Sequence, residues 1–195
     1  MLLRHPYLFV MSSNLLLLVS LGLGETFEFQ QWARFTAQIA AVVLAMLVFL
    51  GPLVHMRLLP SGTVSNGLRR NLGLSYALAM AIHACAITFF LVVTRTPPDL
   101  IPALFGAVVY VFLFAMVITS FSGAKKWLSF RAWKWLHRTG LTLLVLVSIV
   151  TLIGAIPEQS LFSTSALLGA LLFTGSLFKL WLYARGRLNS EPYNA

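Results

Sequence analysis

The sequence is poor in cysteine and in acidic residues, and both shortages exclude whole classes of protein. Cys85 is the single cysteine of 195 residues, so no disulfide within the chain, cysteine-ligated iron–sulfur cluster or CxxC redox pair is possible. Five residues are acidic, and none falls inside a long apolar run, which argues against a proton-coupled carrier built on a membrane carboxylate. Walker, GxGxxG and HExxH motifs are also missing, so nothing indicates that the chain itself binds a nucleotide.

Apolar residues, by contrast, are abundant. They make up 59% of the chain against 10% charged residues, with a mean hydropathy of +0.88, whereas soluble domains are about one quarter charged. Each of six nearly uncharged runs approaches the roughly 20 residues that cross a bilayer. The runs cover residues 7–24, 35–54, 72–93, 103–121, 136–155 and 161–183. Lipid offers no partner to backbone amides and the runs do not alternate, so we predict an all-α membrane protein, a six-transmembrane-helix bundle.

The connections between these runs are short, which leaves no room for a second globular domain. We therefore expect one transmembrane domain over residues 1–195. The opening MLLRHP and the apolar run after it resemble a signal peptide, but no clear small-x-small cleavage site follows. We expect the first helix to be retained.

The basic residues are distributed unequally between the two sides of the predicted membrane. Twelve of the fourteen Lys and Arg residues fall in the N-terminus, the second and fourth loops and the C-terminal tail, whereas Arg34 and Arg95 fall in the other loops. By the positive-inside rule both termini are expected to be cytoplasmic. The net charge of +9 then reflects topology and contact with anionic membrane lipid, and we expect no nucleic-acid partner.

Histidines are the ionisable residues in or beside the apolar runs that could carry chemistry. His83 lies thirteen residues past Arg70, about 20 Å along a helix and so beyond the bilayer middle. His137 lies three residues past Lys134, within roughly 5 Å of the cytoplasmic boundary. His55 follows the second run and makes a weaker candidate.

Two readings of the deep histidine stay open at this point. A neutral imidazole bound to haem iron would explain His83, because the porphyrin needs apolar walls and the surrounding alanines leave room. Alternatively, His83 hydrogen-bonds a neighbouring helix and the alanines are ordinary packing. Near His137, Arg138 and its basic neighbours either neutralise haem propionates or simply lie at headgroup level.

Two segments resemble a known family. RRNLGLSYALAMAIH, residues 69–83, is similar to the Arg-Arg-x-Leu-Gly-Leu segment and helix histidine of ferric reductase-like transmembrane domains, particularly the haem-binding membrane subunits of methionine sulfoxide reductase systems (YedZ/MsrQ type). WKWLHRTG, residues 133–140, resembles the start of that family's fifth helix. The resemblance covers about residues 51–154 and implies His83 and His137 as haem-iron ligands, with Arg70 and Arg138 as further cofactor-binding residues.

The sequence departs from this family at one position. The family usually has a second histidine thirteen residues after the first on the fifth helix, and Val150 stands there. Three outcomes are open. His83 and His137 ligate one haem, if helix tilt removes an offset of order 10 Å; or each binds its own haem, with His55 as a spare ligand; or the site is degenerate and the fold serves as a membrane partner or assembly factor. We favour one haem b.

The function implied is electron transfer in a bacterial inner membrane. Haem b would take electrons from a quinol or a flavin donor and pass them across the bilayer to a partner reductase in the periplasm. The chain would then be a subunit of an oxidoreductase system rather than a self-contained enzyme, and the resemblance alone suggests quinone or flavin. The alternative is a non-redox membrane accessory or transport-related protein in which His83 only packs.

Overall fold

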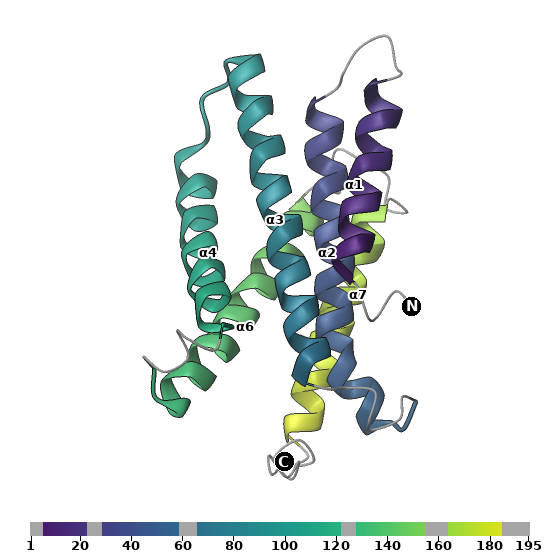
Figure 1. The fold of residues 1–195 in the computed structure, drawn as a ribbon, viewed down its shortest axis with the longest axis vertical. Coiled ribbons are helices and arrows are strands. Elements are labelled where there is room, and N and C mark those ends of the chain that lie inside the picture. Colours follow the sequence, from purple (N-terminus) through teal and green to yellow (C-terminus); the bar gives the residue numbers. More distant parts are fainter. Residues whose placement is uncertain (1–5, 23–28, 59–65, 122–127, 155–163, 185–195) are drawn as a thin grey trace.

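A computed structural model describes residues 6–22, 29–58, 66–121, 128–154 and 164–184 (Figure 1). The described residues form helices and contain no strand, so the all-helical prediction is confirmed. The helices are α1 (Pro6–Gly22), α2 (Phe29–His55), α3 (Asn66–Thr94), α4 (Leu100–Thr119), α6 (Phe130–Gly154) and α7 (Thr164–Ala184).

Five of these helices, α2, α3, α4, α6 and α7, are long and apolar enough to cross a bilayer. The chain is therefore a multi-pass membrane protein. α1 has 17 residues, which is shorter than the roughly 20 that a perpendicular span needs. The first of the six predicted spans thus remains a prediction.

The helices extend beyond several of the predicted apolar runs. α2 begins at Phe29 rather than residue 35, α3 at Asn66 rather than residue 72, and α6 at Phe130 rather than residue 136. Each added segment contains polar or basic residues, which do not interrupt a helix because its backbone hydrogen bonds are made within the segment. The apolar run marks the part inside hydrocarbon, and the helix continues past it.

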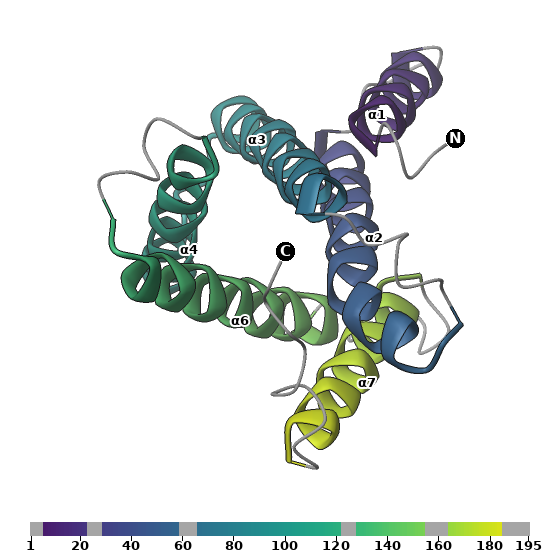
Figure 2. The same cartoon turned by 60° about the horizontal axis from the view of Figure 1, so that its bottom comes forward.

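α2 is the central helix of the bundle. It packs along α3 and α7 and also touches α1, while α6 packs against α4 and α7. Seen from one end, α2, α3, α4 and α6 follow one another around a ring, with α1 and α7 outside it (Figure 2). α3 and α6, which carry His83 and His137, thus occupy different sides of this ring.

Apolar side chains both fill the bundle and cover its outside. Leu44, Leu72, Leu144 and Leu172 are completely or almost completely buried and join α2, α3, α6 and α7 in one core. Large apolar side chains are exposed on the outside of α3, α4, α6 and α7, among them Val92, Phe105, Phe114, Leu146, Val150 and Leu180. In water such a surface would cause aggregation, whereas lipid is an equally apolar neighbour, so this surface is suited to lipid contact.

Small residues allow two pairs of helices to approach closely. Gly140 of α6 faces the Met116 side chain of α4, and Gly175 of α7 faces the Phe49 ring of α2. A side chain at either glycine would occupy space that the partner residue already fills. Packing of this kind replaces the hydrophobic driving force that helices lack in lipid.

Most of the described basic residues gather at one end of the bundle, which we call the basic end. It holds Arg57, Arg69, Arg70, Arg131, Lys134, Arg138 and Lys179, on α3, α6, α7 and the segment after α2. Arg34, Arg95 and Asp99 belong to the opposite end. The structure therefore keeps the two sets apart, and the assignment of the basic end to the cytoplasm remains a prediction.

Candidate functional site

His83 is held by a threonine of the neighbouring helix. Its Nδ1 lies 3.0 Å from Oγ1 of Thr36 in α2, and the Thr36 hydroxyl donates its own proton to the carbonyl of Ala33 at 2.9 Å. Because a hydroxyl has one proton, Oγ1 can only accept from the imidazole, so Nδ1 carries the hydrogen. Nε2 of His83 therefore keeps its lone pair.

This tautomer is the one found when a histidine binds a metal through Nε2. Metal-bound histidines usually donate the other ring N–H to a fixed acceptor, which sets both the tautomer and the orientation of the ring. Thr36 is 1% exposed, so no water competes for its oxygen. His83 thus already has, through Nδ1 and Thr36, the supporting hydrogen bond that a haem-ligating histidine needs.

His137 is held in the opposite way. Its Nε2 lies 3.2 Å from Oγ1 of Thr119, the last residue of α4, and that hydroxyl donates to the carbonyl of Ala115 at 2.7 Å. By the same reasoning Nε2 of His137 carries the hydrogen. Its ring also packs on Trp133, with the ring centroids 4.5 Å apart. His137 therefore joins α6 to α4, and Nε2 must give up Thr119 before it can bind iron.

The two histidines lie at different levels of the bundle. Thr119, the partner of His137, is two residues from Phe121, and the guanidinium of Arg70 lies 5.5 Å from the centre of the Phe121 ring. His137 is therefore near the level of Arg70. His83 is thirteen residues further along α3, or about 20 Å. The structure brings each histidine to a threonine and does not bring the two histidines together.

Val150, which stands where the resembled family usually has a second histidine, points away from the bundle. Its side chain is 70% exposed, whereas Ile149 beside it is 8% exposed. Thirteen residues make 3.6 helical turns, so Val150 lies about 140° around α6 from His137. Since His137 faces α4, Val150 faces the outside. A ligand at this position would not enter the core in this arrangement.

The candidate arginines belong to the basic end. Arg70 contacts the Phe121 ring, as noted, and Arg138 and Arg69 both lie within electrostatic range of Lys179, which is half-buried in α7. This concentration of positive charge suits an anionic group at the level of His137. His55, half-buried, ends α2 at the same end.

Sequence reasoning missed the two threonines. Both stand near the ends of apolar helices, where threonine is common, and neither belongs to the motifs that carry the family resemblance. The contact between residues 36 and 83 depends on how α2 packs on α3, and no local pattern reports it.

The donor set can be compared with what haem requires. Within the described residues no group of three or more His, Cys, Asp or Glu side chains gathers, so a site built from several protein ligands is not found there. Haem needs only one or two axial ligands from the protein. His83 fits that role through Nε2, and His137 fits it only after releasing Thr119.

Comparison of the chain with protein-family models, curated proteins and solved structures finds no match. The fold and its lipid-suited surface define a multi-pass helical membrane protein. Membership of the ferric reductase-like family stays a prediction from residues 69–83 and 133–140.

Proposed function

We propose that the chain is a haem b-binding membrane protein of the bacterial inner membrane that passes electrons from a quinol or flavin donor to a partner reductase. Haem b, when bound, supplies a centre that takes up and releases one electron at a time. The protein's part is to hold that centre inside the bilayer and to control its surroundings. The chain acts in this proposal as an electron-transfer subunit.

The observation that carries the proposal is the contact between Thr36 and His83. A histidine that only satisfied a hydrogen bond between helices would serve equally well in either tautomer. Here Thr36 already donates to Ala33, so the imidazole has to donate through Nδ1. Nε2, the nitrogen that haem iron prefers to bind, is left as an acceptor in an apolar stretch of α3.

We place the haem at His83 and treat His137 as a separate position. The separation of about 20 Å along α3 is far larger than the about 4 Å between two nitrogens that ligate one iron. The packing agrees best with a variant of the second outcome that the sequence leaves open: His83 holds one haem, with another sixth ligand or with none, and His137 holds no haem. Arg70 and Arg138 lie near the level of His137, so they would serve propionates only of a haem bound at the basic end.

Haem-to-protein stoichiometry tests the proposal. The full chain, expressed with ample haem and purified in detergent, should contain one haem b per protein with a reduced-minus-oxidised α band. His83→Ala should lose the haem, whereas His137→Ala and the control His55→Ala should retain it. A colourless wild-type protein would overturn the proposal, and loss of haem in His137→Ala but not in His83→Ala would overturn the assignment of the ligand.

A second candidate function is a non-redox membrane accessory or transport-related protein. The observation that favours it is that both histidines are satisfied by threonines of adjacent helices. In that case each imidazole–threonine pair stabilises a helix contact, as polar pairs in membrane proteins do by about 0.6 kcal/mol. Its distinguishing result is a stable, haem-free wild-type protein whose thermal stability falls in both His83→Ala and His137→Ala.

A further inference from the structure

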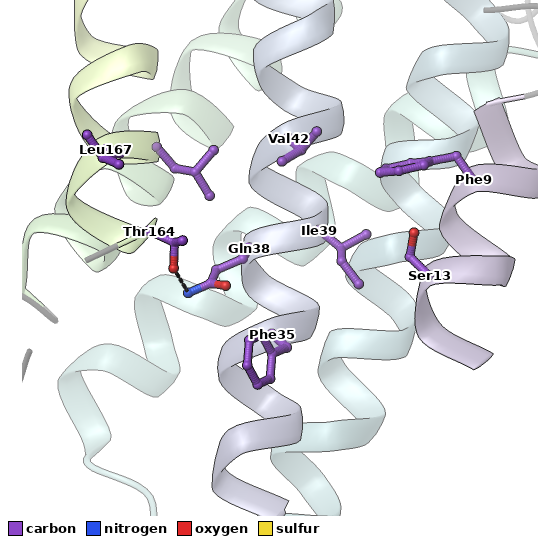
Figure 3. Close-up of a pocket in the computed structure, with 9 residues that line it drawn as sticks. Phe9, Ser13, Phe35, Gln38, Ile39, Val42, Thr164 and Leu167 are labelled. Atoms are coloured by element: carbon purple, nitrogen blue, oxygen red, sulfur yellow. Dashed lines mark hydrogen bonds between the residues drawn. The ribbon is translucent and has the colours of Figure 1, made fainter. Parts of the chain in front are cut away.

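Polar side chains meet inside the membrane-spanning part of the bundle at two separate places that differ in charge. One is a groove along α2 between α1 and α7, in the half far from the basic end (Figure 3). None of its lining residues is charged, and the amide nitrogen of Gln38 donates to Oγ1 of Thr164 at 2.9 Å. The other place is at the basic end, where the half-buried Lys179 lies within electrostatic range of Arg69 and Arg138. The groove satisfies the amide group of Gln38 within the protein, whereas the basic cluster consists of cations alone.

Lys179 lies on the face of α7 that packs into the bundle. It follows the completely buried Leu172 by seven residues, which is close to two helical turns. It follows Gly175, which faces the Phe49 ring of α2, by four residues. The three positions therefore share one face of the helix. A charged side chain on the inner face of a membrane helix is costly, so it usually has a partner or a ligand.

No carboxylate in the described part of the chain neutralises this charge. Asp99 is the one acidic residue among the described residues, and it belongs to the opposite end of the bundle. Arg69 and Arg138 carry the same sign as Lys179, so bringing the three together costs free energy through repulsion. The segment after α7 adds two arginines and one glutamate, which leaves this end net positive. An anion from outside the chain is therefore needed to balance the cluster.

A phosphate group suits this arrangement of cations better than a carboxylate does. The three side chains come from three helices, α3, α6 and α7. A tetrahedral phosphate presents oxygens in several directions, whereas both oxygens of a carboxylate lie in one plane. Guanidinium groups pair with phosphate oxygens through two parallel hydrogen bonds, and the lysine adds a point charge. Arg69 also stands in the first turn of α3, where the helix dipole favours an anion.

The cluster lies near the depth at which phospholipid headgroups begin. Lys179 is three residues, or about 5 Å, before Leu182, where the apolar stretch of α7 ends. Phe178 and Trp181 flank it in the sequence and stack with their ring centroids 5.6 Å apart, and tryptophan is typical of the membrane interface. A lipid headgroup and a phosphate dissolved in water both reach this level.

We propose that Lys179, Arg69 and Arg138 together bind one phosphate group at the basic end, supplied by the headgroup of an anionic phospholipid or by a soluble phosphate. The bound group accepts hydrogen bonds from α3, α6 and α7 and offsets the repulsion among the three cations. The site is separate from the proposed haem position, because His83 lies fourteen residues, or about 21 Å, beyond Arg69 along α3. The inference therefore does not depend on haem binding.

Binding of phosphate-bearing probes to the full chain tests the site. The purified chain in lipid-free detergent is mixed with phosphatidylglycerol, with zwitterionic phosphatidylcholine, with inorganic phosphate, or with acetate at equal ionic strength as the carboxylate control. Native mass spectrometry reports bound mass, and thermal unfolding reports stability. Retention of phosphatidylglycerol in preference to phosphatidylcholine identifies the lipid as the source. Stabilisation by inorganic phosphate without any lipid identifies a soluble phosphate.

Substitutions within the cluster should weaken this binding selectively. Lys179→Met and Arg69→Gln should each lower the affinity about 10- to 100-fold, the loss of a hydrogen bond between charged groups. Arg131→Gln removes the same charge at an exposed position of the basic end and should leave the affinity unchanged. This control separates the site from the general attraction of anions to the basic end.

Stability without any phosphate gives a readout that a purely structural role of Lys179 would not produce. In that condition Lys179→Met removes an unbalanced charge from an inner face, so it should unfold at the same temperature as the wild type or higher. With saturating probe the wild type should be the more stable protein. A lower unfolding temperature of Lys179→Met without phosphate would show that the chain itself neutralises Lys179, and would overturn the inference.

Three further results would also overturn it. They are a wild-type protein that binds neither probe, equal weakening of binding in Arg131→Gln, and acetate binding as strong as that of phosphate. Haem content is measured in the same samples and should not change in any variant. Loss of haem in Lys179→Met would assign the cluster to haem propionates instead of a phosphate group.

Discussion

The imidazole of His83 in α3 donates through Nδ1 to Oγ1 of Thr36 in α2, across 3.0 Å. This pair joins two helices through an acceptor that is shielded from water, since Thr36 is 1% exposed. It also decides which ring nitrogen is available for other chemistry. The predictions below separate that chemical role from a purely structural one and then examine the packing around it.

Removing the acceptor at position 36 should weaken haem binding. In Thr36→Val the side chain keeps its shape but the Nδ1–H of His83 loses its partner, and loss of such a contact typically costs 10- to 100-fold in metal affinity. We expect faster haem loss to an apo-globin acceptor, and Thr36→Ser should restore retention. Thr119→Val, the matched change at His137, should not alter it. Equal haem loss in both valine variants would count against a special role of Thr36.

A histidine placed at position 150, where the resembled family usually has one, should have no effect on haem. The side chain at position 150 points outward, so Val150→His places an imidazole toward lipid. The haem-to-protein ratio and the α band should match those of the wild type. Leu146→His, at another outward position of α6, controls for the general cost of a lipid-facing histidine. A second haem in Val150→His alone would show that α6 is rotated relative to this structure.

The contact between α7 and α2 should not tolerate even a methyl group at Gly175. A Cβ there would lie 2.7 Å from two carbons of the Phe49 ring, which is rigid and cannot bend away. Gly175→Ala should therefore destabilise the protein by about 1–3 kcal/mol, the usual cost of overpacking. Thermal unfolding in detergent measures this.

Gly73→Ala is the matched control for that substitution. A Cβ at Gly73 meets no atom within 4 Å, and alanine favours helix more than glycine does. Its unfolding temperature should equal or exceed that of the wild type. If Gly175→Ala is as stable as Gly73→Ala, the α2–α7 contact is looser than described.

The end of α2 should become more stable with glycine at position 57. Arg57 has φ of 58°, in the left-handed region, where the amides of Arg57 and Leu58 bond to the carbonyls of Val54 and Leu53. A non-glycine residue pays about 1 kcal/mol for this conformation. Arg57→Gly should raise the free energy of unfolding by about that amount. Arg57→Ala removes the charge but keeps the strain, so a similar gain there would mean that charge, not φ, is responsible.

Much of the fold was predictable because it follows from composition along short stretches. Residues 103–121, for example, have almost no alternative to a membrane helix, since an uncharged apolar run of that length must satisfy its backbone within itself. The helix limits were less predictable. Residues 29–34 contain glutamines and an arginine, and their polarity hid a helix that leaves the hydrocarbon without ending.

Some features of the candidate site were likewise predictable from the sequence, and others were not. The depth of His83 below Arg70 was a matter of counting residues along one helix, and the structure keeps both on α3. The hydrogen-bond partner of His83 could not be found by counting, because residues 36 and 83 meet only through the packing of α2 on α3. Counting along the fifth run also placed Val150 thirteen residues past His137, but the direction of its side chain followed from which face of α6 meets α4.

The sequence by itself determined that this protein is helical and apolar enough for a membrane, with its basic residues sorted to one end and a histidine deep in α3. These are properties of single segments, set by side-chain hydrophobicity and helical rise. Only the tertiary structure decided that Thr36 sets the tautomer of His83, that His137 contacts Thr119 of α4, and that a groove lies beside α2. Each depends on the rotation and crossing of helices, which side-chain packing between distant segments controls.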